Sequence, residues 1–161
     1  AKIMAIEIVR DYFKKFDMDN KILEFPVSSR TVRLAAVALG TQEARIAKTM
    51  SFKKDDGCIL VVTAGDVKID NAKYRHTFGL KAKMLTPDEV TEYVGHAIGG
   101  VCPFAVKDGV KGIYIDESVK RFETIFPACG SRNSAIELTP EELFKYSNAD
   151  RWVDVCKLKE E

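Results

Sequence analysis

Histidine and closely spaced cysteines are scarce in this sequence, which limits the metal sites it can build. Only two of its 161 residues are histidines and four are cysteines. The cysteines stand 44, 27 and 27 residues apart, at Cys58, Cys102, Cys129 and Cys156. A structural zinc site needs ligands in pairs such as Cys-x-x-Cys, and no such pair is present. We therefore expect no metal, and reduced thiols typical of a cytoplasmic protein.

Long apolar runs and an excess of one charge are also missing. No segment approaches the ~20 apolar residues of a membrane span, and the N-terminus lacks a signal-peptide pattern. We therefore expect no membrane partner. The 25 basic and 24 acidic side chains give a net charge of +1, so no overall field attracts DNA or RNA. The basic stretch 66–83 fits either a local RNA contact or a solvated helix face.

Three motifs of common enzymes do not occur: the GxxxxGK[ST] loop, the GxGxxG fingerprint and the GxSxG elbow. Their absence argues against the usual phosphate-binding loop, the usual dinucleotide site and the serine-hydrolase nucleophile turn. We expect a site that uses no nucleotide cofactor and contains few ionisable groups.

The composition is that of a folded domain, with 46% hydrophobic and 30% charged residues. No repeat, low-complexity tract or linker divides the chain, so we expect residues 1–161 to form one domain with a single core. Helices are expected at 6–16, at 28–40 with Ser28-Ser29 as N-cap, and at 70–79. Two further helices should open at the capping boxes Thr86-Pro87-Asp88-Glu89 and Thr139-Pro140-Glu141-Glu142.

Strand signals alternate irregularly with these helices. A hairpin turn at Asp55-Asp56-Gly57 separates the runs 46–52 and 58–63, and the second run reads as fully buried. Further strand candidates lie at 112–116, 124–128 and 134–138. The pattern predicts an α/β fold whose mixed, curved sheet is flanked by helices.

Lys48 is an anomaly in the first strand of the hairpin. Strand alternation puts it on the more hydrophobic face with Ile46, Met50 and Phe52. An ammonium group there must reach water, find a partner or line a cavity that receives a charged ligand. A lysine of an edge strand that extends to solvent fits the pattern equally well.

A second anomaly is the segment GHAIGGVCPF at 95–104, where three glycines and a proline interrupt an apolar stretch. Two successive amide groups in such a turn can hold a carbonyl or phosphate oxygen, although many glycine turns only change chain direction. Cys102 is either a nucleophile without an identifiable base or a small packing thiol. His76 and His96 show no partner pattern, so we interpret both as structural or solvent-facing.

A third loop, at 129–134, follows a strand candidate and offers small polar donors, and Arg132 can meet a phosphate. Together, the segment 45–52, the segment 95–104 and Cys129-Gly130-Ser131 followed by AIELTP at 135–140 resemble the YbaK-like family. That family includes the editing domain inserted in some prolyl-tRNA synthetases. The resemblance extends from about residue 24 to residue 143.

The resemblance implies a partly barrel-like fold and hydrolysis of the ester that links a wrong amino acid to the 3′ end of a tRNA, without a cofactor. Lys48 matches the essential lysine, implied to hold the substrate's 3′ end. The other residues implied to bind substrate are Gly99, Gly100, Val101, Cys102 and Pro103 of one loop, and Gly130, Ser131 and Asn133 of another. The implied partners are the mischarged tRNA acceptor end and an aminoacyl-tRNA synthetase. Groups of the substrate itself are implied to replace a protein base.

The chain departs from the family pattern at two places. Cys102 stands where many relatives carry serine, and Ser131-Arg132-Asn133 matches neither the cysteine-removing nor the alanine-removing pattern. The removed amino acid, cysteine, alanine or another small one, therefore stays open. Two other functions also stay open: a non-catalytic module that binds tRNA or a synthetase, and a Schiff-base enzyme that uses Lys48.

Overall fold

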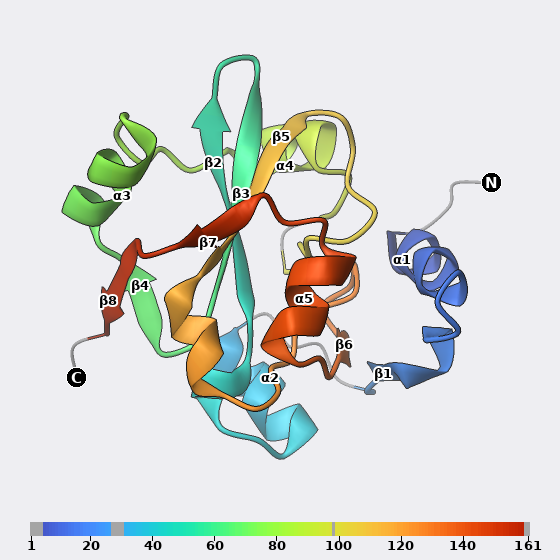
Figure 1. Cartoon of the computed structure of the whole chain (residues 1–161). Coiled ribbons are helices and arrows are strands. Elements are labelled where there is room, and N and C mark those ends of the chain that lie inside the picture. Colours follow the sequence, from blue (N-terminus) through green and yellow to red (C-terminus); the bar gives the residue numbers. More distant parts are fainter. Residues whose placement is uncertain (1–4, 27–30, 98, 160–161) are drawn as a thin grey trace.

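The computed structural model describes residues 5–26, 31–97 and 99–159 (Figure 1). The helices in these ranges are α1 (Ala5–Lys14), α2 (Val32–Leu39), α3 (Asn71–Phe78), α4 (Pro87–Tyr93) and α5 (Pro140–Tyr146). The strands are β1 (Ile22–Glu24), β2 (Lys48–Lys54), β3 (Gly57–Thr63), β4 (Val67–Ile69), β5 (Val110–Asp116), β6 (Ser134–Ile136), β7 (Arg151–Val153) and β8 (Cys156–Leu158).

The predicted helix starts depend on local caps, and most are confirmed. Thr86 and Thr139 each form a complete capping box, with proline in the first turn of α4 and α5. Asp70 caps α3, and the side chain of Thr31 accepts from the Leu34 amide at the start of α2. The predicted cap Ser28-Ser29 lies outside the described residues. Helix boundaries were therefore readable from short-range signals.

A mixed sheet crosses the middle of the molecule in the order β2-β3-β5-β7 (Figure 1). The predicted hairpin is confirmed, since β2 and β3 pair antiparallel and their register closes at Lys54 and Gly57. β3 then pairs parallel with β5, and β5 with β7. This arrangement confirms the α/β fold with a mixed sheet. All seven residues of β3 are buried, as predicted.

The sheet differs from the prediction in its smaller parts. The pairs β1-β6 and β4-β8 form separate two-stranded sheets, so the described strands do not close into one barrel. Strands β1, β4, β7 and β8 were not predicted, because three residues are too few for an alternating pattern.

The predicted strand at 124–128 is wrong. Within it, Phe126 bridges Ile46, while Ile125 bridges Leu138 on another segment. The chain thus changes partners between consecutive residues, and Pro127 has no N–H to continue a ladder. The consequence for the site is that 124–128 closes only one end of the edge strand β2.

Candidate active site at the edge of β2

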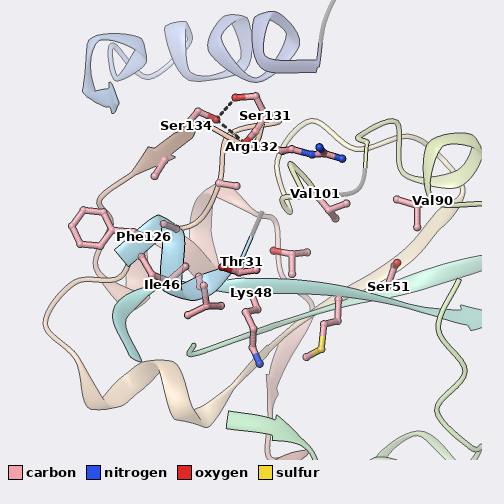
Figure 2. Close-up of a pocket in the computed structure, with 18 of the residues that line it drawn as sticks. Thr31, Ile46, Lys48, Ser51, Val90, Val101, Phe126, Ser131, Arg132 and Ser134 are labelled. Carbon is pink, nitrogen blue, oxygen red and sulfur yellow. Dashed lines mark hydrogen bonds between the residues drawn. The ribbon is translucent and has the colours of Figure 1, made fainter. Parts of the chain in front are cut away.

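A cavity of about 420 Å³ lies along β2. Its walls come from α2, from the glycine loop through Gly99 and Val101, and from the loop that carries Ser131 and Arg132 (Figure 2). The consecutive residues 46–51 all contribute to its lining. Because strand side chains alternate between faces, a cavity that touches consecutive residues must lie along the strand edge.

Lys48 is among the residues that line this cavity, but its ammonium group points to the other face of the strand. Figure 2 shows its side chain on the opposite side of β2 from Ser51, Val101 and Arg132. Its Nζ donates to the backbone oxygen of Val67 in β4 at 2.5 Å. Burial, followed by the nearby Lys159 cation, lowers the pKa of Lys48 to about 8. The ammonium therefore has a partner inside the protein and does not extend freely to solvent.

The glycine loop packs directly on the third loop. Gly99 has a φ of +94°, which glycine adopts without cost. A Cβ atom at Gly99 would lie 2.6 Å from Nε of Arg132, and one at Gly100 would lie 2.7 Å from the backbone of Ser131. The two glycines thus allow a close approach of the two loops. Sequence reasoning treated these loops separately, whereas the structure joins them into one wall.

The amide groups of the glycine loop are not all available to a ligand. The N–H of Gly100 donates to the carbonyl of Ala97 at 3.0 Å within the turn. The N–H groups of Gly99 and Val101 have no hydrogen-bond partner among the described residues. Because the Gly100 amide is used within the turn and Pro103 carries no N–H, the donors left at the cavity wall are the single amides of Gly99 and Val101 and not two successive amides.

Cys102 and Pro103 lie behind the cavity wall. Cys102 is fully buried, and burial raises the pKa of its thiol to about 12. Its sulfur lies 3.5 Å from Nε2 of His96, which is also 3.0 Å from the carbonyl oxygen of Phe104. Since a carbonyl only accepts, Nε2 carries a proton and cannot take one from the thiol. The histidine partner was missed because the contact forms only when the loop folds back.

Replacing Cys102 by alanine is expected to lower stability and leave the reaction intact. The thiol fills a buried site, so its loss should reduce the free energy of unfolding by roughly 1 kcal/mol, as for other single-group deletions in a core. Urea unfolding measures this change. The kcat/KM of the ester hydrolysis that the family resemblance implies should stay within about threefold of the parent, because an un-ionised thiol is a poor nucleophile. A loss of a hundredfold would instead assign the thiol to the chemistry.

The third loop places Ser131 at the cavity, and neighbouring polar groups of the loop fix its hydroxyl by hydrogen bonds. The Ser131 hydroxyl lies 2.8 Å from Oγ of Ser134 and 3.1 Å from Oδ1 of Asn133. Nδ2 of Asn133 donates to the backbone oxygen of Phe25 at 2.9 Å. Gly130 has a φ of +94° and approaches the start of α1. Ser131 and Ser134 line the cavity, whereas Gly130 and Asn133 do not line it and support the loop from behind.

The charged residues that line the cavity are Lys48 and Arg132, and no acidic side chain joins them among the described residues. Hydroxyl groups of Thr31, Thr49 and Ser51 were not predicted to belong to the site. Strand alternation did place Thr49 and Ser51 on one face, but nothing in the sequence showed that a cavity covers it. Across the described ranges, no three His, Cys, Asp or Glu side chains gather to hold a metal ion.

Comparison with known proteins defines the family to which this chain belongs. Residues 27–146 match the family model described as the aminoacyl-tRNA editing domain. The chain belongs to this family, as the resemblance predicted. A solved structure described as a candidate trans-editing enzyme for prolyl-tRNA synthetase superposes with a TM-score of 0.85 at 27% identity, over 98% of this chain and 99% of that one.

Curated relatives include both free-standing proteins and parts of larger enzymes. The uncharacterised protein YwhH of Bacillus subtilis is 54% identical over 96% of this chain and 98% of its own length. EbsC of Enterococcus faecalis, named as a candidate Cys-tRNA(Pro)/Cys-tRNA(Cys) deacylase, is 28% identical over 70% of each chain. The proline–tRNA ligase of Halalkalibacterium halodurans is 31% identical over 66% of this chain and 18% of the ligase. No helix in the described ranges is long and apolar enough to cross a membrane.

Proposed function

We propose that this protein hydrolyses the ester bond of mischarged tRNA as a trans-editing enzyme. The observation that carries the proposal is the cavity along β2, which combines two cationic residues, a glycine loop and an open strand edge. The cations suit a phosphate or a developing negative charge. Membership of the editing family supports the ester of an aminoacyl-tRNA as the substrate.

The proposed roles follow the geometry of the cavity walls. Lys48 holds the 3′ end of the tRNA. To do so, its side chain must rotate so that the ammonium group leaves the Val67 carbonyl. Single amides of the loop Gly99–Pro103 bind the ester carbonyl, and Ser131 forms the facing wall. Water attacks the carbonyl carbon, the bond from that carbon to the ribose oxygen breaks, and the ribose oxygen receives the proton. Since the lining holds no acidic or histidine base among its described residues, we assign proton transfer to the substrate's own hydroxyl group.

The lining favours a small, uncharged amino acid. Most lining side chains are apolar, and the hydroxyls of Ser51 and Ser131 are neutral. A lysine or arginine substrate would meet the like charge of Arg132, which disfavours its binding. We therefore propose cysteine, alanine or a similar small residue as the amino acid removed, and a cytoplasmic site of action, where tRNA is charged.

A panel of tRNAs charged with wrong amino acids tests the proposal directly. The purified protein should release at least one small amino acid faster than buffer does, without an added cofactor. Absence of release from every member would overturn the proposed function. Retained binding without release would favour the second candidate, a binding module for tRNA or a synthetase, which the missing protein base also fits. A steep loss of affinity with salt would then identify tRNA as its ligand.

The activity is expected to fall as the pH rises through about 8. Lys48 has a pKa lowered to about 8, so its ammonium form dominates below this pH and is lost above it. The kcat/KM should thus fall about tenfold per pH unit on the alkaline side. In Lys48→Arg, the guanidinium stays charged, so the alkaline fall in kcat/KM should move to higher pH. An identical alkaline fall in both proteins would assign the titration to the substrate's amino group.

A further inference from the structure

The outer edge of β2 is paired at Ala47, at Ser51 and at Lys53, and it is open between the first two of these positions. In an antiparallel pair, successive residues direct their backbone groups alternately toward the partner strand and away from it. The N–H of Ala47 points away from β3 and donates to the carbonyl of Phe126 at 3.0 Å. The carbonyl of Ser51 also points away and accepts from the amide of Leu85 at 3.3 Å. The same alternation turns both backbone groups of Thr49 outward.

These outward groups of Thr49 face the cavity. Within the described residues, neither its N–H nor its carbonyl has a hydrogen-bond partner, and the N–H of Ser51 has none either. Residues on both sides of this point line the cavity. An unpaired strand edge is a template that hydrogen-bonds another extended segment. Here the template is one residue long, because Phe126 and Leu85 close its two ends.

We propose that the aminoacyl group of the substrate docks on Thr49 as a single added residue of the sheet. This inference rests on the proposed function. The α-ammonium of the amino acid donates to the Thr49 carbonyl, and the ester carbonyl accepts from the Thr49 N–H. These two bonds reproduce the ring of a hydrogen-bonded antiparallel pair. Because the edge is paired at Ala47 and Ser51, one aminoacyl group, with one donor and one acceptor, matches the open groups of Thr49.

Docking on this edge also sets the direction of the amino acid side chain. Opposed residues of an antiparallel pair carry their side chains on the same face of the sheet. The substrate side chain therefore follows that of Thr49, on the face where Figure 2 shows Ser51, Val101 and Arg132. Lys48 lies on the other face, where it can contact the 3′ end of the tRNA but not the amino acid side chain. The backbone edge thus recognises any aminoacyl group, and the walls around Val101 select its side chain.

Nuclear magnetic resonance tests this docking without requiring turnover. The probe is 3′-(alanylamino)-3′-deoxyadenosine, whose amide link resists hydrolysis and whose methyl group is small. The amide protons of Thr49 and Ser51 should shift saturably on titration. The amide of Lys53 is the matched control on the same strand, since it already donates to the Lys83 carbonyl at 2.7 Å and should not shift.

A second measurement removes the Thr49 N–H alone. Thr49→Val is prepared with valine and with the α-hydroxy acid analogue of valine, so that the two proteins differ only by an N–H against an oxygen. The α-hydroxy protein should bind the probe about tenfold more weakly, as expected for one lost hydrogen bond. Its melting temperature should match that of the valine protein, because this N–H has no partner within the described fold.

The outcomes separate this inference from the proposed function. Shifts at Gly99 and Val101 without a shift at Thr49 overturn the docking inference and leave the proposed function standing. Equal affinity of the two Thr49→Val proteins, or no shift at any residue, also overturns it. If Thr49 shifts and the α-hydroxy protein binds weakly, but no mischarged tRNA is hydrolysed, the docking stands and the hydrolase assignment fails.

Discussion

Lys48→Ala is expected to lower kcat/KM for mischarged tRNA by about a hundredfold or more. The variant removes one of the two cationic residues that line the cavity, and with it the proposed charge-assisted contact with the 3′ end. Single-turnover hydrolysis of a mischarged tRNA measures the effect. The fold should persist, because Lys48 is only partly buried and its carbonyl partner Val67 belongs to a separate strand.

Two variants control for this result. Lys54→Ala removes a lysine of the same strand that does not line the cavity, and it should keep parental activity. Lys48→Arg keeps the charge but not the compact ammonium, so it should retain more activity than Lys48→Ala. Activity of Lys48→Ala within threefold of the parent would remove Lys48 from the site.

Gly100→Ala is expected to reduce both stability and activity. The new Cβ would lie 2.7 Å from the backbone of Ser131 and 2.8 Å from that of Gly130, so one loop must move. Overpacking of this kind costs roughly 1–3 kcal/mol in the free energy of unfolding. Because a displacement of about 1 Å can cost a hundredfold in rate, kcat/KM should fall by about that factor. Urea unfolding and ester hydrolysis measure the two effects.

Gly79→Ala provides a matched control for stability. Gly79 ends α3 with a φ of +75°, and a Cβ atom there would meet nothing within 4 Å. The substitution should cost about 1–2 kcal/mol, because alanine disfavours the left-handed conformation. Its kcat/KM should stay at the parental level, since α3 does not line the cavity. If both variants lose activity equally, general destabilisation and not loop geometry explains Gly100→Ala.

Several elements of the fold could be predicted because their signals are short-range. The capping boxes at Thr86 and Thr139 are confirmed, since a cap depends on residues three positions apart. The hairpin from β2 to β3 is confirmed, because its turn and both strands are contiguous. The strand at 124–128 was wrong for the opposite reason, since its pairing depends on two distant segments.

The candidate site was only partly predictable. Alternation separated Lys48 from Ser51, and Figure 2 places them on opposite sides of β2. It could not show that the loop of Gly99 faces the Ser51 side, because that depends on how residues 95–109 return to the sheet. The contact between His96 and Cys102 depends on the same fold-back. The roles of the predicted site residues remain predictions for the experiments above.

The sequence by itself determined the family, the helix boundaries and the hairpin that carries Lys48, because residue types at short spacing encode them. Only the tertiary structure decided that Gly100 packs on Ser131, that the Lys48 ammonium turns toward Val67, and that the edge of β2 stays open at Thr49. These features are contacts, or gaps, between segments far apart in the chain. Their geometry depends on the packing of the whole core, which no local pattern of residues records.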